Sequence, residues 1–162
     1  MDLSKQAAFW IEKLKMSPHP EGGYFKEEYR PATWKPIAGY PADRRVLTTI
    51  YYLLEDMDYS AFHRIKSPES WFFHKGKPLL IFSFEEGQLV CRELSDRESG
   101  QLQVTIEPDT WFAARLKEPE GFALVSCAVA PGFEYKDFEL ARKEILIDLF
   151  PLDKDIIDQL CR

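Results

Sequence analysis

The sequence predicts an all-β fold of the jelly-roll type with short helices near its two ends. The first observation is a series of short β-branched and aromatic runs separated by turn residues, over residues 24–30, 46–54, 61–65, 70–73, 79–84, 89–94, 102–106, 110–116 and 122–130. The second is an aromatic content of 14%, a high share that strands and pockets favour. The third is that apolar residues at helical spacing occur only toward the ends of the chain.

Helices are expected over residues 4–14, 138–149 and 153–160. In the first two segments, apolar residues recur every three or four positions, at Ala7, Ala8, Ile11, Leu14, Phe138, Ala141, Ile145 and Leu149. Two prolines and two glycines between Met16 and Gly23 end the first helix. Many short strands between terminal helices favour a sandwich or barrel over a parallel sheet with crossover helices.

The length of 162 residues predicts one domain over residues 1–162, with a core that needs no disulfides. The formal net charge of −6 disfavours nucleic acid as a partner, because phosphate binding requires a basic surface. The same charge disfavours anionic membrane surfaces, and no run approaches the roughly 18 apolar residues of a membrane span. We therefore expect neither a nucleic-acid nor a membrane partner.

Cysteine usage indicates a reducing compartment. Cys91, Cys127 and Cys161 are odd in number and far apart, which disfavours a disulfide framework. None of them forms a Cys-x-x-Cys pair, so a structural zinc site is also disfavoured. The first 15 residues carry charges throughout and lack the apolar run of a signal peptide. We expect a soluble cytoplasmic protein.

The segment from Phe62 to Gly76 resembles the first signature of the cupin superfamily. That signature has two histidines two residues apart, a glutamate four residues later and a glycine seven residues beyond. His63, Glu69 and Gly76 fall on these intervals, whereas Ile65 occupies the second histidine position. The resemblance implies the cupin scaffold but puts its metal chemistry in question.

The second cupin signature is matched less well. Pro108 agrees with it, but Ala113 stands where the third metal-binding histidine belongs. Two of the four usual ligand positions therefore remain. Because transition-metal sites in proteins usually have three or four protein ligands, we expect no metal and no other cofactor.

Further runs resemble one branch of the superfamily, the cupin-5 or DUF985 group. Besides the central segment, they are Pro18 to Phe25, Pro108 with Trp111 and Ala113, Val129 to Phe133, and Asp137 to Glu139. The resemblance spans roughly residues 7–150. It implies the double-stranded β-helix of the sugar-epimerase-like cupins, a dimer, and a group whose activity is not established.

We expect a homodimer. An open edge strand invites pairing, and aromatic-rich strands leave more apolar surface than one barrel interior hides. The expected interface places the strand from Tyr24 to Arg30 beside the partner's sheet. The alternative is that residues 4–30 cap their own barrel.

Strand alternation predicts the pocket. If His63 points into the barrel, Ile65 does too, and Glu69 begins a second inward set with Trp71 and Phe73. Trp111 is expected to share the inner face of its strand with Ala113. The resulting pocket is aromatic, with one imidazole and one carboxylate. His63 and Glu69 either act as acid and base or satisfy each other in the barrel interior.

A second candidate region begins at Glu21, where paired glycines permit positive φ and close backbone approach. Glu21, Glu28 and Arg30 are candidates for ligand contacts, although a solvated edge explains these charges about as well. Tyr24 is a candidate acid. His74 is expected at the surface, by strand parity, and His19 in a rigid proline-flanked turn.

Three functions remain open, all with a small-molecule ligand. The first is a metal-independent isomerase or epimerase acting on a small cyclic, carbohydrate-like molecule, with His63 as base and Tyr24 as acid. The second is a non-catalytic module that binds or senses a small molecule. The third, which Ile65 and Ala113 disfavour, is a metal-dependent dioxygenase.

Overall fold

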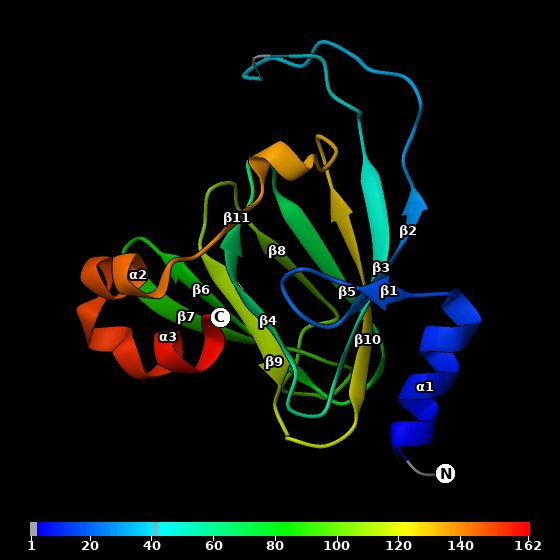
Figure 1. Cartoon of the computed structure of the whole chain (residues 1–162), viewed down its shortest axis with the longest axis vertical. Coiled ribbons are helices and arrows are strands. Elements are labelled where there is room, and N and C mark those ends of the chain that lie inside the picture. The colour runs from blue at the N-terminus through cyan, green and yellow to red at the C-terminus, as the bar shows by residue number, and fades with distance from the viewer. Residues whose placement is uncertain (1–2, 41) are drawn as a thin grey trace.

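Two antiparallel sheets face each other in the computed structural model, which describes residues 3–40 and 42–162. The six-stranded sheet has the order β1-β2-β3-β10-β5-β8. Its strands are β1 (Ser17–Pro18), β2 (Tyr24–Tyr29), β3 (Thr48–Glu55), β10 (Phe122–Val129), β5 (Glu69–Gly76) and β8 (Gln103–Ile106). Figure 1 shows this sheet beside helix α1 (Leu3–Leu14).

The five-stranded sheet has the order β11-β4-β9-β6-β7. Its strands are β11 (Glu139–Leu140), β4 (Tyr59–Arg64), β9 (Phe112–Leu116), β6 (Leu79–Glu85) and β7 (Gln88–Leu94). The chain passes from one sheet to the other between β3 and β4, β4 and β5, and β5 and β6. This alternation gives the predicted jelly roll, so the predicted fold class is confirmed.

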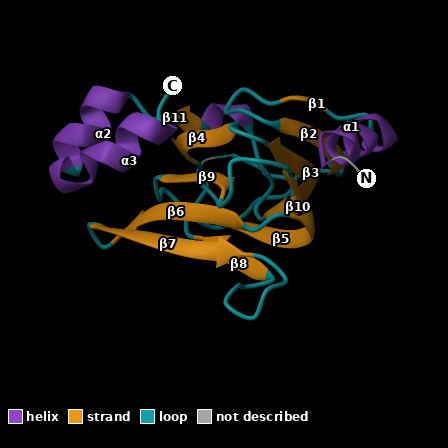
Figure 2. Ribbon diagram, turned by 90° about the horizontal axis from the view of Figure 1, so that it is seen from below, coloured by secondary structure: helices purple, strands orange, loops and turns teal. Residues whose placement is uncertain are grey.

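Helices cover the outer faces of both sheets. Helices α2 (Lys143–Leu149) and α3 (Lys154–Leu160), with the 3₁₀ turn η2 (Pro151–Asp153) between them, lie on the five-stranded sheet. Figure 2 shows them on the side opposite α1. None of the described helices is long and apolar enough to cross a membrane.

The predicted helix over residues 138–149 begins later than expected. Glu139 and Leu140 pair with Arg64 and His63 as strand β11, and regular helix starts only at Lys143. The apolar spacing at Phe138 and Ala141 reflects two different environments, because Phe138 lines a cavity while Ala141 packs under the helices.

Three apolar clusters hold these layers together. The largest lies between the sheets and includes Trp71, Leu79, Leu94, Phe112 and Val125. A second lies between the five-stranded sheet and the C-terminal helices, and a third joins α1 to β3 and β10. Burying apolar area of this kind is the main stabilising contribution to folding.

A long loop joins β2 to β3 and projects beyond the strands, at the top of Figure 1. Two arginines near its end tie it to the segment 131–138. Arg44 is buried and forms an ion pair with Asp137, and Arg45 Nη1 donates to Glu134 Oε1 at 2.6 Å. The same segment contains the 3₁₀ turn η1 (Tyr135–Asp137) and crosses one end of the barrel.

Candidate functional site

A cavity lies between the two sheets at the end of the barrel nearest η1. Its walls are mostly aromatic and apolar, with a few titratable groups; they comprise His19, Glu21, Phe25, Glu27, Arg30, Thr48, Ile50, Tyr52, His63, Ile65, Glu69, Trp71, Cys127, Val129, Phe133, Tyr135 and Phe138. Its empty volume, including the solvent at its mouth, is about 610 Å³. Such a cavity suits a small molecule.

His63 and Glu21 form the central polar pair of this cavity. The Nε2 atom of His63 lies 3.1 Å from Oε2 of Glu21, and both side chains are buried. The Nδ1 atom of His63 lies 2.7 Å from the carbonyl oxygen of Ala61. Since a carbonyl oxygen only accepts, Nδ1 carries a hydrogen, and Nε2 and Glu21 share one further proton.

Burial determines the charge of this pair. It lowers the pKa of His63, against the smaller opposing effects of Glu69 and the Ala61 carbonyl. It raises the pKa of Glu21, although His19 and the hydrogen bond from Ser60 oppose the shift. Both changes favour the neutral pair, in which protonated Glu21 donates a hydrogen bond to Nε2.

A tight turn between β1 and β2 brings Glu21 into the cavity. The His19 amide donates to the Gly23 carbonyl at 2.9 Å, and the Gly22 amide donates to the His19 carbonyl at 3.0 Å. Gly22 has a φ of +117°, and a Cβ there would lie 2.0 Å from the Tyr59 carbonyl oxygen. Only glycine permits this approach, so the paired glycines set the position of Glu21.

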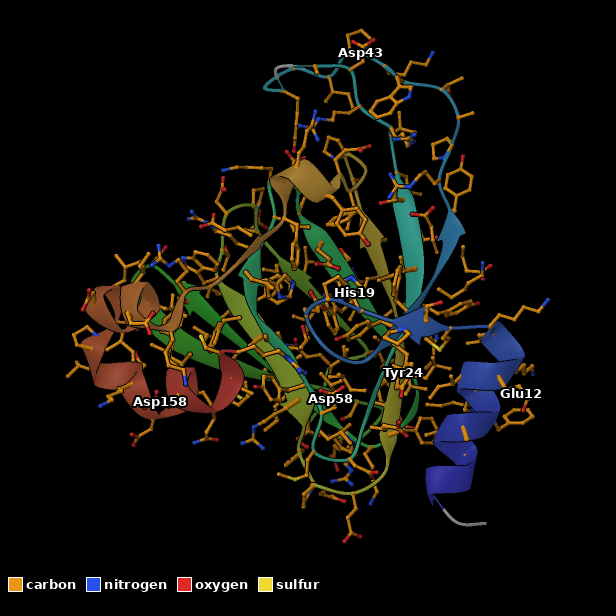
Figure 3. All side chains as sticks on the ribbon, viewed as in Figure 1. Glu12, His19, Tyr24, Asp43, Asp58 and Asp158 are labelled. Carbon is orange, nitrogen blue, oxygen red and sulfur yellow. The ribbon has the colours of Figure 1, made fainter. Side chains whose placement is uncertain are left out.

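Neighbouring strands hold the turn and its carboxyl group in place. The Ser60 hydroxyl donates to Glu21 Oε1 at 2.9 Å, and the Ala61 amide donates to the Glu21 carbonyl at 2.9 Å. The Tyr52 hydroxyl donates to the Gly22 carbonyl at 2.6 Å. Figure 3 shows His19 on this turn, which crosses in front of the strands.

Glu69 is the second acid–base group of the cavity. It lies on β5, in the sheet opposite to β4 and His63, and its side chain is buried. Burial raises its pKa to about 7, with Glu21 adding to the shift and His63 opposing it. A carboxyl group with this pKa exchanges its proton near neutral pH, which is what general acid–base catalysis requires.

His19 also lines the cavity, although it was expected only as part of a rigid turn. Its ring meets those of Phe25, Tyr52 and Phe138 edge to face, with centroids 4.8, 5.9 and 6.3 Å away. Its Nδ1 atom accepts a hydrogen bond from the Glu21 amide at 3.3 Å, and burial lowers its pKa. The ring is therefore neutral at pH 7, with its hydrogen on Nε2.

Arg30 and Glu27 lie at the mouth of the cavity. The Arg30 Nε atom donates to Glu27 Oε2 at 2.7 Å, and Nη1 donates to the Phe133 carbonyl at 2.9 Å. Glu27 shares the inward face of β2 with Phe25 by regular alternation, and a shift of the pairing register between Glu27 and Tyr29 turns Arg30 to the same side. Bulges of this kind commonly re-aim side chains beside functional sites.

The donor set of the cavity does not fit a metal ion. In the part of the chain that the structure describes, no group of three or more His, Cys, Asp or Glu side chains is arranged to hold one. Both nitrogens of His63 already face oxygen atoms, and Ile65 and the Phe112 ring flank the imidazole with apolar groups. The arrangement suits hydrogen bonding and proton transfer.

Five of the predicted site residues line this one cavity: His63, Glu69, Trp71, Glu21 and Arg30. Their catalytic and binding roles stay predictions. The expected hydrogen bond between His63 and Glu69 needs correction, because His63 Nε2 faces Glu21 instead. Glu21 was expected as a ligand contact and lies deeper, as the partner of the histidine.

Four predicted residues lie outside the cavity lining. Trp111 packs beneath the C-terminal helices with Ala113 on the outer face of its sheet, and Phe112 takes the inner position, 4.2 Å from the His63 ring centroid. The expected parity of β9 was therefore wrong by one residue. Phe73 does point inward, but it lies farther along β5 and packs in the central apolar cluster.

Tyr24 and Glu28 are the other two. Tyr24 packs against the cluster between α1 and the six-stranded sheet, so it is not placed to protonate a ligand in the cavity. Glu28 is exposed. It was expected on the same face as Arg30, but regular alternation gives the inward face to Phe25 and Glu27, and the register shift after Glu27 turns only Arg30 to that face.

Sequence reasoning missed part of the cavity wall. Phe133, Tyr135 and Phe138 come from the segment after β10, and Tyr52 and Cys127 come from the two central strands. The run from Val129 to Phe133 indicated the family but gave no sign that its aromatic ring reaches the cavity. His74, as expected, is exposed, where its Nε2 contacts the Ser126 hydroxyl at 2.9 Å.

Three proteins resemble this chain over most of its length. A protein of Shewanella oneidensis with a crystal structure is 33% identical, covers 96% of this chain and 97% of its own, and superposes with a TM-score of 0.86. A hypothetical protein from Leishmania major is 31% identical, with coverages of 96% and 98% and a TM-score of 0.87. An uncharacterised protein of Saccharomyces cerevisiae is 29% identical over 150 residues, which are 83% of this chain and 74% of the yeast protein.

More distant structures share the fold alone. Oxalate decarboxylase from Bacillus subtilis is 14% identical with a TM-score of 0.55, over 88% of this chain and 36% of that chain. A Streptomyces protein variant with uridine is 13% identical with a TM-score of 0.51, over 82% and 88% of the two chains. The cupin fold thus occurs both in enzymes and in proteins whose activity is not established.

The sequence profile described as Cupin superfamily (DUF985) matches residues 8–141. This range contains the turn with Glu21, the strands with His63 and Glu69, and the segment 131–138 at the cavity mouth. The chain therefore belongs to the cupin superfamily, in the family described as DUF985.

Proposed function

We propose that the protein is a metal-independent isomerase or epimerase that acts on a small, hydroxylated cyclic molecule of carbohydrate type. The observation that carries the proposal is Glu69, a buried carboxyl group whose pKa is raised to about 7 and which faces a cavity containing the His63–Glu21 pair. Strongly shifted titratable groups in a cleft are typical of acid–base sites.

The chemistry follows from the positions of these groups. Epimerisation next to a carbonyl requires that a base removes the proton from carbon, which forms an enediol-type intermediate. An acid must then return a proton to the same carbon from the opposite face. Glu69 and His63 belong to opposite sheets, and at neutral pH Glu69 is present in both protonation states.

The two roles are assigned by charge. Ionised Glu69 removes the proton from carbon, and the proton shared by His63 and Glu21 is delivered from the other wall. This proposal differs from the expected roles: Glu69 is the base in place of His63, and the His63–Glu21 pair supplies the acid in place of Tyr24, which packs elsewhere. The neutral forms of His63 and Glu21 keep that proton available in a buried site.

The walls of the cavity suit a ring. Trp71, Tyr52 and Phe138 present aromatic faces or edges, which pack against the C–H groups of a sugar ring. The mostly apolar lining limits the water around the reacting carbon, which protects an enediol intermediate.

Proton exchange tests this proposal. Wild type and Glu69→Gln are incubated in D₂O with a panel of aldoses, ketoses and their acids, and NMR follows deuterium entering at carbon. We expect exchange with at least one compound and a loss of about 100-fold or more in Glu69→Gln. Glu85→Gln, whose carboxylate pairs with Arg92 outside the cavity lining, should keep the wild-type rate.

Exchange that is equal in Glu69→Gln would contradict the proposal. Binding of a panel compound without any exchange would instead favour a non-catalytic module that binds or senses small molecules. One observation supports that second candidate: His63, Glu21 and Ser60 satisfy one another's hydrogen bonds without a ligand.

A metal-dependent dioxygenase is the third candidate. The predicted absence of a stoichiometric metal rests on Ile65 and Ala113, which occupy two of the four usual ligand positions. The Phe112 ring packed against His63 supports it. Elemental analysis of the purified protein tests it. About one equivalent of Mn, Fe, Ni or Zn per chain, lost in His63→Ala, would revive the dioxygenase.

The proposed working form is a cytoplasmic homodimer. Strand β1 pairs with only two residues of β2, so much of the β2 edge is open, and the nearby Tyr29, Trp34 and Val46 are exposed. An open edge with apolar neighbours favours pairing with a second copy. A monomer in light scattering at micromolar concentration would rule the dimer out.

The described cysteines, Cys91, Cys127 and Cys161, are free, which suits a reducing compartment.

A further inference from the structure

We propose that the ligand carries one anionic group, a carboxylate or a phosphate, and that Arg30 binds this group at the mouth of the cavity. The inference rests on the proposed function, because it places the rest of the ligand between Glu69 and His63. It narrows the ligand from any small hydroxylated ring to an acidic one.

The position of Arg30 is the first support. A regular strand would turn Arg30 and Glu28 to the same face, but the register shift after Glu27 breaks that alternation. The bulge brings the Arg30 guanidinium to the cavity, where its side chain keeps 24% of its surface exposed. A bulge interrupts the regular hydrogen bonds between two strands. A side chain that a bulge turns toward a cavity is therefore a candidate for a functional role.

The hydrogen bonds of Arg30 leave one edge of its guanidinium open. Nε donates to Glu27 and Nη1 donates to the Phe133 carbonyl and, at 3.5 Å, to Glu134. Among the described residues, no hydrogen bond involves Nη2. An arginine anchored at Nε and Nη1 is pre-organised to donate from Nη2 to a further oxyanion.

The charges around Arg30 do not cancel it. Glu134 receives its shorter hydrogen bond from Arg45, at 2.6 Å against 3.5 Å from Arg30. Among residues 3–40 and 42–162, Glu27 is therefore the one carboxylate that pairs closely with Arg30, and it is exposed, so water screens that pair. An anionic ligand group at Nη2 would meet an arginine that retains part of its charge.

The inner end of the cavity also offers donors. The Trp71 indole is buried, and its Nε1–H has no hydrogen-bond partner in the described structure. The protonated form of Glu69 is a further donor. A buried donor without a partner costs free energy, which a ligand carbonyl or hydroxyl oxygen recovers.

A cationic ligand fits less well. Glu27 already accepts from Arg30, and Glu21 already engages Ser60 and His63. Glu69 is only partly ionised at neutral pH. The cavity groups that still lack a hydrogen-bond partner are therefore mostly donors. They favour a ligand that has oxygen acceptors at both ends and a negative charge at the mouth of the cavity.

Binding of matched probes tests the proposal. Calorimetry follows the binding of four probes, each titrated to about 100 mM: D-glucose, D-glucuronate, D-glucose 6-phosphate and inorganic phosphate. The weakest binding that this range detects has a dissociation constant of about 100 mM, a binding free energy of about −1.4 kcal/mol. The variants are Arg30→Gln and Arg30→Lys, with Arg45→Gln as the matched control. Arg45 also pairs with Glu134 but is outside the cavity lining, so its loss removes the same charge from the same network.

We expect wild type and Arg45→Gln to bind one or both sugar acids about tenfold or more tightly than glucose, with binding weakened by added salt. Arg30→Gln should lose this preference for the acids. Arg30→Lys should retain part of it, because lysine keeps the positive charge but lacks the planar guanidinium that donates two parallel hydrogen bonds. The glucuronate and glucose 6-phosphate arms distinguish a carboxylate from a phosphate. Saturation by inorganic phosphate alone would place the recognition in the anion rather than in the ring.

Two outcomes would overturn the inference: no saturable binding of any anionic probe to wild type, or the same preference for the acids in Arg30→Gln. Thermal unfolding checks that each variant is folded. If Arg30→Gln does not fold, Arg30→Lys tests the role of Arg30 in its place. The proposed function fails separately. Binding of the acids without proton exchange at carbon would support the role of Arg30 and reject the isomerase. Proton exchange in neutral sugars alone would support the isomerase and reject the role of Arg30.

Discussion

The two ends of the barrel interior are built from the same strands but differ in chemistry. At the packed end, β3, β5 and β10 contribute Leu54, Phe73 and Val125 to the apolar cluster between the sheets. At the cavity end, inward positions of β3 and β5 carry Thr48 and Glu69. Strand alternation therefore explains which residues point inward at both ends, whereas the residue type alone decides which end packs and which stays open.

The difference has an energetic meaning. Apolar side chains at the packed end gain free energy by leaving water, while Glu21, His63 and Glu69 lose hydration when they are buried. The hydrogen bonds from Ser60 to Glu21 and from His63 to the Ala61 carbonyl offset only part of that loss, as the raised pKa values of both glutamates and the lowered pKa of His63 indicate. The packed end stabilises a site that would not persist by itself.

The largest effect is expected at the packed end. Leu79 is fully buried between the sheets, and Leu79→Ala should lower the free energy of unfolding by about 2–5 kcal/mol through lost burial and a cavity. Chemical denaturation measures this. Leu152→Ala is the control, because Leu152 is 98% exposed and its change should cost little. Equal effects of the two would mean that this cluster is not the stabilising core.

The second effect concerns the turn that presents Glu21. In Gly22→Ala, the new methyl group would collide with the Tyr59 carbonyl, so the turn must move and withdraw Glu21 from His63. We expect a loss of about 1 kcal/mol or more in stability and a change in the His63 NMR signals. Gly87→Ala is the matched control, because its φ of +80° is also positive but no atom lies within 4 Å of the added Cβ. Unchanged His63 signals in Gly22→Ala would contradict the proposed role of the turn.

The third effect is a dependence of stability on pH. Glu69 has a folded pKa of about 7, above its ordinary value of 4.5, so between these values the folded protein holds a proton that the unfolded chain releases. Stability from this group is thus full below pH 4.5 and falls as the pH rises through 7, by on the order of 3 kcal/mol.

Glu69→Gln removes this titration while keeping the shape of the side chain. The variant should gain stability relative to wild type between pH 5 and about 8, as measured by urea unfolding at each pH. The difference between the two proteins is the quantity of interest, because Glu21 gives a slope of the same sign and the buried histidines give the opposite sign. A constant difference across this range would show that Glu69 titrates normally.

Much of the fold was predictable because hydrophobic alternation and turn residues act locally. The main predicted strands recur in the structure with small shifts at their ends, and His63 and Glu69 do share a cavity. The site was less predictable because register is not local. On β9 the inward residue is Phe112 and not Trp111, one position away from the expected one. On β2 alternation turns Glu27 and not Glu28 inward, and one bulge turns Arg30 to the same face.

Other parts of the site depend on contacts between distant segments. The pairing of Glu21 with His63 joins positions 42 apart in sequence, and a backbone turn with two glycines makes it possible. The aromatic wall from Phe133, Tyr135 and Phe138 reaches the cavity because Asp137 pairs with Arg44 on the long loop. Neither feature has a periodic signature that a sequence displays.

The most direct test of the account is a pH titration of Glu69 itself. Protein labelled with ¹³C at glutamate side-chain carboxyls is followed by NMR, and the signal absent from Glu69→Gln identifies the group. The account predicts a midpoint near 7 in the free protein, because burial between the sheets disfavours the charged form. A midpoint at the ordinary value of 4.5 would contradict it, since Glu69 would then be a fully ionised carboxylate at neutral pH and not an acid–base group.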